Sequence, residues 1–432
     1  MKKFIQTIKN IYKIEELRKR IVYTFLLILV YRLGSFIVLP GIDPSVIAEF
    51  SASMSNRTDA LSLLNMFSGG AFGNVSIFAL GVMPYISASI VVQLLGVFVG
   101  KFRKMQAEES GRRKLNQITR LLTIVILCIQ GPAYISNIMH QYPNAFLVSS
   151  KLYILAATVI LLGGSMFVMW LGERITERGI GNGISLIIMI GIIARLPQAF
   201  MAEVLSKAGS TTGGILLLIV EFVILFFVFV AAIALVQAVR KVPVQYANRV
   251  IGNKQYGGVR QYIPLKVNAS GVMPIIFAQA IMLFPIIFSR FDATRGFAAA
   301  MSNYTGLWYN LVFGFLVIVF TYFYTAVTFQ PNMMAEDMKK NGGFIPGVKP
   351  GKKTMEYLDT IMTRIVLPGS IFLAIIAVLP AIATLCGVNN QFASFYGGTS
   401  LLILVGVVLD TLQQVESHLL MRHYDGLMKT GR

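Results

Sequence analysis

Long apolar runs separated by short polar segments fill the chain from end to end. A helix needs about 20 apolar residues to cross the hydrocarbon core of a bilayer, and ten runs come close to that length. They cover residues 21–39, 75–99, 118–138, 152–171, 183–200, 213–238, 269–289, 306–329, 363–386 and 394–412. This pattern predicts an all-α polytopic membrane protein with ten transmembrane helices.

The composition excludes several other classes of protein. Of the 432 residues, 56% are hydrophobic and only 13% are charged, whereas soluble domains carry about 25% charged residues. A chain this apolar would collapse, which excludes intrinsic disorder. The two cysteines, Cys128 and Cys386, both lie inside apolar runs, so a disulfide scaffold is excluded as well.

Basic residues are concentrated in every second loop, which places them on one side of the predicted membrane. Most of the 38 Lys and Arg residues fall in residues 1–20, 100–120, 172–182, 239–268, 330–364 and the tail after 412. Cytoplasmic loops carry such an excess, so we expect both termini in the cytoplasm and the net charge of +19 on that face. A topology signal would account for this asymmetry. However, loops 239–268 and 330–364 are longer than such a signal requires, and a basic docking surface for an acidic partner is the alternative.

The apolar segment from Leu61 to Phe72 is too short to cross a bilayer and is followed by Gly73. Irregular backbone at membrane depth is tolerated where it is buried in protein or lines an aqueous cavity. One interpretation is an amphipathic helix on the outer membrane surface. The other is a re-entrant half-helix that enters a central cavity, with Gly69 and Gly70 as its hinge.

Proline occurs early in two of the predicted spans, as Pro84 and Pro274. We expect each proline to interrupt the hydrogen bonding of its helix in mid-membrane. Matching proline helices suggest a single membrane domain, residues 1–432, built from two related five-helix halves, 1–200 and 201–432.

Residues that carry chemistry are scarce. We expect charge within the spans only at Arg32, Glu221 and Asp410, which counts against an ion-coupled carrier with a cluster of intramembrane charges. In the basic stretch 346–353, Pro346 stands where a phosphate loop needs its first glycine and Lys353 where it needs Ser or Thr. We therefore expect no enzyme, no catalytic residue, no metal site and no cofactor. A secondary transporter for neutral solutes and a pore-less insertase scaffold stay as alternatives.

Several long motifs carry a resemblance to a known family. They are Asn65–Gly70 (NMFSGG), Phe78–Ser89 (FALGVMPYISAS), Trp170–Ser185 (WLGERITERGIGNGIS), Pro264–Asn268 (PLKVN), Phe344–Gly351 (FIPGVKPG) and Gly397–Ile403 (GGTSLLI). Through them the chain resembles the SecY/Sec61-alpha family from its first span to its C-terminal tail. The resemblance implies a gated channel that translocates unfolded polypeptides and releases transmembrane segments through a lateral gate.

The resemblance also implies a plug and a pore ring. The plug maps to about residues 58–74 and includes Leu61, Leu64, Asn65, Met66, Phe67, Ser68, Gly69 and Gly70. The ring consists of aliphatic side chains, which can gate a pore by dewetting. Its members are Val82, Ile86, Ile188, Ile192, Ile276 and Ile403. Without the resemblance, ordinary helix packing or lipid contact would explain each of these residues.

Two further sets of residues follow from the same resemblance. Ser87, Gln130 and Gln279 are expected to hydrogen-bond across the lateral gate, with packing inside one half as the alternative. Docking of the motor and the ribosome is expected at basic residues of the two long loops, which are Arg240, Lys241, Lys339, Lys340, Lys349, Lys352 and Lys353. Lys349 stands where the family typically has Arg, so the charge is kept but the bidentate fork is lost.

The partners implied by the resemblance are the small membrane subunits SecE and SecG, the SecA motor ATPase, the ribosome, unfolded preproteins with signal sequences and the lipid bilayer, with SecDF and YidC as more distant candidates. The expected location is the bacterial inner membrane, as a multi-pass protein with cytoplasmic termini. A thylakoid membrane is the alternative.

Overall fold

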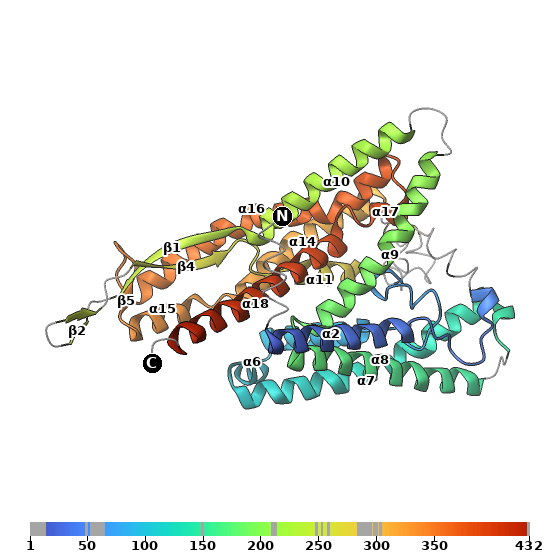
Figure 1. The fold of residues 1–432 in the computed structure, drawn as a ribbon, viewed down its shortest axis with the longest axis horizontal. Helices are drawn as coiled ribbons and strands as arrows, with labels where there is room; N and C mark the ends of the chain where they lie inside the picture. Colours follow the sequence, from blue (N-terminus) through green and yellow to red (C-terminus); the bar gives the residue numbers. More distant parts are fainter. Residues whose placement is uncertain are drawn as a thin grey trace. The chain divides into compact units, whose positions relative to one another are not determined.

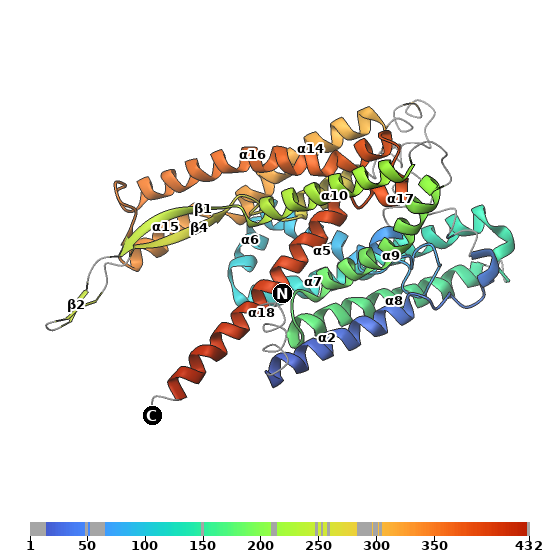
Figure 2. The same ribbon diagram turned by 45° about the horizontal axis from the view of Figure 1, so that its top comes forward.

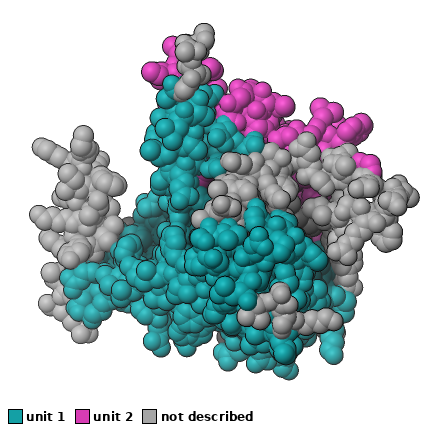
Figure 3. All heavy atoms as spheres, turned by 90° about the vertical axis from the view of Figure 1, so that its right-hand side faces the viewer, with its two compact units in different colours: residues 1–211, 389–392, 406–432 teal, residues 212–388, 393–405 magenta. Residues whose placement is uncertain are grey.

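The computed structural model describes residues 14–47, 51, 65–147, 151–208, 214–246, 249–251, 254–256, 260–282, 296, 301 and 305–429. The chain forms two compact units (Figure 3). Unit 1 comprises residues 1–211, 389–392 and 406–432, and unit 2 comprises residues 212–388 and 393–405. The last long helix is therefore shared between the units. The expected division into halves 1–200 and 201–432 stays a prediction.

Unit 1 is a bundle of helices around the pair α7 and α8. Its helices are α2 (Glu15–Gly34), α5 (Met83–Phe98), α6 (Gly100–Ala107), α7 (Glu109–Gln141), α8 (Lys151–Arg178) and α9 (Gly183–Ala208), with the 3-10 turn η1 (Pro143–Ala145) after α7. Helices α2 and α9 pack on α8, while α5 and α6 pack on α7 (Figure 1). An apolar cluster that includes Val75, Leu127, Ile135 and Leu161 fills the space between them.

Unit 2 is built on the long antiparallel contact between α14 (Leu307–Thr328) and α16 (Lys352–Leu385). Helix α11 (Met273–Met282) packs on α14, and α10 (Gly214–Gln237) contacts α16. Helix α15 (Pro331–Lys340) packs on the start of α16. The short helix α17 (Asn390–Ala393), most of which belongs to unit 1, precedes α18 (Gly398–Lys429), which begins in unit 2 and continues in unit 1.

A β-ribbon forms part of the loop that we expected at 239–268. Strand β1 (Val239–Tyr246) pairs antiparallel with β4 (Arg260–Lys266), and β5 (Gly343–Phe344) pairs with the far end of β1. Strands β2 (Arg249–Ile251) and β3 (Lys254–Tyr256) form a second, two-stranded sheet. The signal was the alternation in β1, where Val242 and Val244 are buried and their neighbours are exposed, as in a strand with one buried face.

The buried face of the ribbon packs on helices of the same unit. Val242, Val244 and Leu265 join Met338 of α15 and Leu358 of α16 in one apolar cluster. Both ribbon views show β1 and β4 running beside α15 and α16 (Figures 1 and 2). This cluster holds β1 and β4 against α15 and α16 within unit 2.

Seven helices are long and apolar enough to cross a membrane, among the residues that the structure describes. They begin at Ser110, Leu152, Gly183, Gly214, Leu307, Lys352 and Gly398. All ten predicted spans overlap a described helix, and α5 contributes a shorter apolar helix, Met83–Gly96. The chain is a multi-pass membrane protein, and the count of ten crossings stays a prediction.

The expectation that Pro84 and Pro274 interrupt their helices was wrong. Helix α5 begins at Met83 and α11 begins at Met273, so each proline lies in the first turn, where its missing N–H has no partner to lose. The preceding glycines, Gly81 and Gly271, have φ of 50° and 62°. Such backbone cannot belong to an α-helix, and the spans predicted to start at 75 and 269 therefore start later.

Candidate functional site

The segment from Asn65 to Val82 lies against α2, α7 and α9 in unit 1. Residues 65–67 are helical, and the chain then follows successive turns up to Val82. The carbonyl of Asn65 accepts the Gly70 N–H at 2.9 Å, and its side-chain oxygen accepts the Gly73 N–H at 2.8 Å. These bonds close residues 65–73 into a compact turn, which we call the knot, because one buried asparagine satisfies two separate backbone donors.

This knot is buried in protein. Asn65 and Ala71 are fully buried, and Met66 and Phe72 are 5% exposed. Such burial argues against the amphipathic surface helix that the sequence left open. Leu61 and Leu64, together with the rest of residues 58–64, lie outside the described residues.

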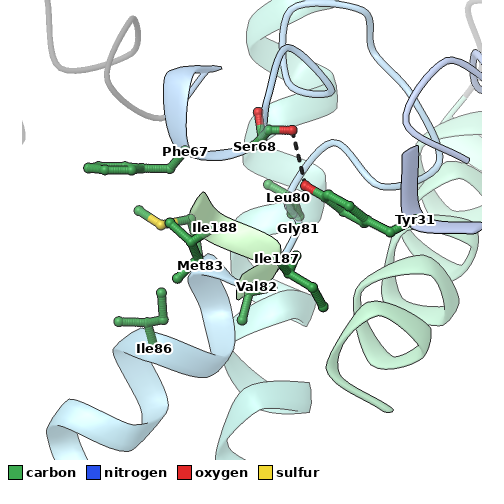
Figure 4. A pocket seen from close by; sticks show the side chains of 10 residues that line it. All are labelled: Tyr31, Phe67, Ser68, Leu80, Gly81, Val82, Met83, Ile86, Ile187 and Ile188. Carbon is green, nitrogen blue, oxygen red and sulfur yellow. Dashed lines mark hydrogen bonds between the residues drawn. The ribbon is translucent and has the colours of Figure 1, made fainter. Parts of the chain in front are cut away.

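Side chains from two helices hold the carbonyls of the knot. The Tyr31 hydroxyl of α2 donates to the Ser68 carbonyl at 3.2 Å (Figure 4). Arg32, the next residue of α2, donates from Nη1 to the Gly69 carbonyl at 3.2 Å. On the other side, the Tyr134 hydroxyl of α7 donates to the Phe72 carbonyl at 2.6 Å. The sequence analysis missed Tyr31 and Tyr134, since nothing in a single apolar run reveals a bond to a distant turn.

One face of α9 meets the knot. Ile188, Gly191, Ile192 and Arg195 are spaced three, four and seven residues apart, which places them on one face of a helix. A Cβ added at Gly191 would lie 2.9 Å from the Phe67 carbonyl oxygen and 3.1 Å from the Gly69 nitrogen. The backbones of the knot and of α9 are thus in direct contact.

Arg195 corrects one expectation from the sequence. We limited charge within the spans to three residues, but Arg195 lies within the predicted span 183–200 and inside α9. Its Nη2 is 3.3 Å from the position that a Cβ of Gly70 would take. A second guanidinium, in addition to that of Arg32, therefore lies beside the glycine turn.

Part of the expected ring meets at one pocket. Val82 and Ile86 from the start of α5 and Ile188 of α9 line a pocket with about 250 Å³ of empty space, part of it open to solvent. Tyr31 and Phe67 line the same pocket (Figure 4). Its walls are almost entirely apolar, so it offers water few hydrogen-bond partners.

The remaining ring residues lie elsewhere. Ile192 is fully buried on α9. Ile276 in the first turn of α11 is half-buried, and Ile403 in α18 is 6% exposed; both belong to unit 2. The ring as a whole stays a prediction.

Among the expected gate residues, Gln279 has a partner within its own unit. Its Nε2 donates to the Thr399 hydroxyl of α18 at 3.3 Å, and both residues belong to unit 2. This contact favours the alternative of packing inside one half. Ser87 is half-buried on α5 and Gln130 is exposed on α7, and the gate stays a prediction.

The expected docking residues are all exposed on three neighbouring elements. Arg240 and Lys241 lie on β1, Lys339 and Lys340 end α15, Lys349 lies in the turn before α16, and Lys352 and Lys353 begin α16. That turn is fixed by a bond from the Thr354 hydroxyl to the Lys349 carbonyl, 3.0 Å.

The position of Lys352 and Lys353 is unfavourable for their own helix. Positive charge near a helix N-terminus opposes the macrodipole, whereas Lys339 and Lys340 at a C-terminus agree with it. The stability of α16 therefore does not account for Lys352 and Lys353. Among the residues that the structure describes, no group of His, Cys, Asp and Glu side chains has the arrangement of a metal site.

Comparison with known proteins gives one consistent family. The family model for SecY matches residues 76–412. The chain is 39% identical to the protein translocase subunit SecY of Chlamydia trachomatis, over 99% of this chain and 98% of the relative. It is 41% identical to that of Halalkalibacterium halodurans, over 98% of this chain and all of the relative.

Solved structures share the fold. A structure from work on the SecY plug domain matches with a TM-score of 0.59 at 17% identity, covering 93% of this chain and 92% of that one. Sec61 in the canine ribosome-channel complex matches with a TM-score of 0.51 at 15% identity, with the same coverage. Both matches are too distant in sequence to carry more than the fold.

Proposed function

The chain belongs to the SecY family, and from this premise we infer that it is the channel subunit of a protein translocase, a gated conduit for polypeptides across a membrane. The observation that carries the inference is the apolar pocket where Phe67, Val82, Ile86 and Ile188 meet. The curated relatives, alike over almost their whole length, are named protein translocase subunits. The channel is not an enzyme, and the energy for transport comes from partners.

We propose that residues 58–74 are the plug and that six aliphatic side chains form the pore ring. Val82, Ile86, Ile188 and Ile192 would supply one part of the ring, and Ile276 and Ile403 the other. Such side chains offer water and ions no hydrogen-bond partners, so a narrow ring of them dewets. The same side chains yield around a passing polypeptide, because none of them binds a particular sequence.

We propose further that unfolded preproteins with signal sequences are the substrates and that apolar segments leave sideways into lipid. Ser87, Gln130 and Gln279 are the candidate polar residues of this lateral gate. The Gln279–Thr399 bond would then hold α11 to α18 within unit 2 while the gate opens elsewhere.

The exposed basic surface on β1, α15 and α16 is the proposed docking site for the ribosome and the SecA motor. Its support is the charge of seven exposed Lys and Arg residues and the ribosome-bound state of one structural neighbour. SecE and SecG are the proposed small subunits, with SecDF and YidC further away. The positive-inside bias supports a cytoplasmic position for this surface and for both termini. The relatives are bacterial, so the bacterial inner membrane is the proposed location.

Deletion of residues 60–72 tests this function. The purified channel is reconstituted in planar bilayers and its ion conductance is measured without substrate. We expect the deletion to raise the conductance well above that of the intact protein, because the pore loses its plug. A matched deletion of residues 249–256, at the tip of the β-ribbon, should leave the conductance unchanged. An unaltered conductance after the 60–72 deletion would contradict the plugged channel and favour a carrier or a scaffold.

A further inference from the structure

The knot at 65–73 is held by its backbone. In the part of the chain that the structure describes, three hydrogen bonds join it to neighbouring helices, and all three end on main-chain carbonyls, those of Ser68, Gly69 and Phe72. Two of the three donors are consecutive residues of α2, Tyr31 and Arg32. Consecutive carbonyls are thus paired with consecutive side chains.

The opposite side of the same turn rests on a glycine of α9. A Cβ at Gly69 would lie 2.7 Å from the Cα of Gly191, and a Cβ at Gly191 would lie 2.9 Å from the Phe67 carbonyl oxygen. Real Cβ atoms essentially never come closer than about 3 Å to other atoms of this kind. A helix interior disfavours glycine, so Gly191 needs a packing reason, and the approach of the two backbones supplies it.

Gly191 also lies between two residues of the proposed ring. Ile188 and Ile192 are its neighbours on the same face of α9. A turn that rests on Gly191 is therefore positioned at the ring, and any side chain at 191 would lift it away. Tyr31 and Arg32 fix the turn laterally through its carbonyls.

We propose that Tyr31, Arg32 and Gly191 form a latch that holds the plug closed and sets how readily the channel opens. The proposal rests on the function proposed above for residues 58–74. Tyr31 and Arg32 are the hydrogen-bond donors, and Gly191 is the seat, by which we mean the position on α9 against which the turn packs. In this role all three are positioning residues that act through the turn at Ser68 and Gly69.

The substitution Tyr31→Phe tests the donor side. It removes one hydroxyl and keeps the ring, so the fold is retained, and we expect about a fivefold rise in open probability from the loss of one buried hydrogen bond. Tyr396→Phe is the matched control. The Tyr396 hydroxyl donates to the Glu221 carbonyl at 2.8 Å, which is also a buried bond to a backbone carbonyl, but in unit 2.

The substitution Gly191→Ala tests the seat. The added methyl group pushes on the Phe67 carbonyl and the Gly69 nitrogen, and we expect a larger rise in conductance than from Tyr31→Phe. Gly163→Ala is its control, since Gly163 is also a glycine within a helix and a Cβ there would meet nothing within 4 Å. Arg32→Lys, which keeps the charge and a donor, should leak less than Arg32→Met.

The readouts are conductance in planar bilayers and the melting temperature in detergent. A rise in conductance at an unchanged melting temperature, absent from Tyr396→Phe and Gly163→Ala, supports the latch. If the 60–72 deletion raises conductance while Tyr31→Phe and Gly191→Ala behave as the unaltered chain, the latch is overturned and the plug stands. If the deletion itself has no effect, the proposed function fails first. Equal leakage from the two controls would also overturn the latch, because it would indicate general loosening.

Discussion

The same four residues begin one helix in each unit. Gly-Val-Met-Pro occupies residues 81–84 before and within α5, and residues 271–274 before and within α11. Both glycines have positive φ, and in both helices the valine carbonyl accepts the N–H four residues on, Ile86 at 3.1 Å and Ile276 at 3.3 Å. The sequence thus specifies both helix starts locally and in the same way.

The two units are also alike at one residue upstream of the tetrapeptide, which makes the same contacts in both. Four positions before each glycine, the N–H of Ile77 donates to the Ile37 carbonyl beyond α2, and the N–H of Val267 donates to the Ala238 carbonyl beyond α10, each at 2.9 Å. A glycine of a long helix then meets the carbonyl of each residue. Gly164 of α8 faces Ile77, and Gly369 of α16 faces Val267.

The two units differ in what precedes this shared arrangement. In unit 2 the chain arrives from β4, which pairs along its length with β1. In unit 1 it arrives from the buried knot at 65–73, where residues 65–67 are helical and residues 68–73 form turns. This common frame is therefore preceded by a proposed docking ribbon in unit 2 and by a proposed plug in unit 1.

The largest difference between the two frames should appear at the packing glycines. An added Cβ at Gly164 would overlap the Ile77 carbonyl oxygen, whereas one at Gly369 would lie 3.1 Å from the Val267 oxygen. We expect Gly164→Ala to cost about 2–3 kcal/mol. Gly369→Ala should be nearly neutral, because the gain of about 1 kcal/mol in helix propensity offsets the closer contact. Thermal melting of both variants in detergent measures the difference, and equal losses would show that the two frames are packed alike.

A smaller effect is expected at the glycines that precede the helices. Gly81→Ala and Gly271→Ala each force a side chain into left-handed backbone, at about 1–2 kcal/mol. Neither added Cβ would come closer than 3.7 Å to another atom, so the backbone cost should be the same in both. The melting temperatures of the two variants test this. A loss confined to Gly81→Ala would mean that the shared tetrapeptide does not act alike in the two units.

The smallest effect is expected at the prolines. Pro84→Ala and Pro274→Ala remove a ring from a first helical turn, where no hydrogen bond is at stake, and should each destabilise the protein by about 1 kcal/mol, largely by freeing the unfolded chain. Had the prolines interrupted mid-membrane helices, alanine would instead stabilise them by about 3 kcal/mol. The sign of the change in melting temperature distinguishes the two arrangements.

Hydropathy predicted the positions of the helices because a bilayer crossing demands an apolar run of fixed length. It placed the starts of α5 and α11 too early, since Ile77 and Val272 are apolar whether they lie in a helix or in a turn. In both cases the glycine three residues before the proline marks the true start of the helix. The β-ribbon escaped prediction for a similar reason, as Val242 and Val244 supply only two buried positions in a short strand.

The candidate site was only partly predictable. Its glycine pair, Gly69 and Gly70, stood out as a break in an apolar segment. Gly191 did not, because a close approach between two backbones far apart in sequence leaves no periodic signal. Arg195 was left out of the charges expected within the spans, although it lies inside the apolar run 183–200 and inside α9.

The carbonyl contacts of Tyr31, Arg32 and Tyr134 have a consequence for evolution. A peptide carbonyl is the same at every residue, so these bonds survive the exchange of most side chains in the knot. Gly69 and Gly70 are exceptions because their φ angles of 63° and 93° disfavour a side chain. Asn65 and Ser68 are exceptions because their side-chain oxygens accept the Gly73 and Phe72 N–H groups. Met66 is buried, but none of these bonds depends on its side chain. A mutational scan of residues 65–73 should therefore tolerate the exchange of Met66 for other apolar residues more readily than any substitution at the two glycines.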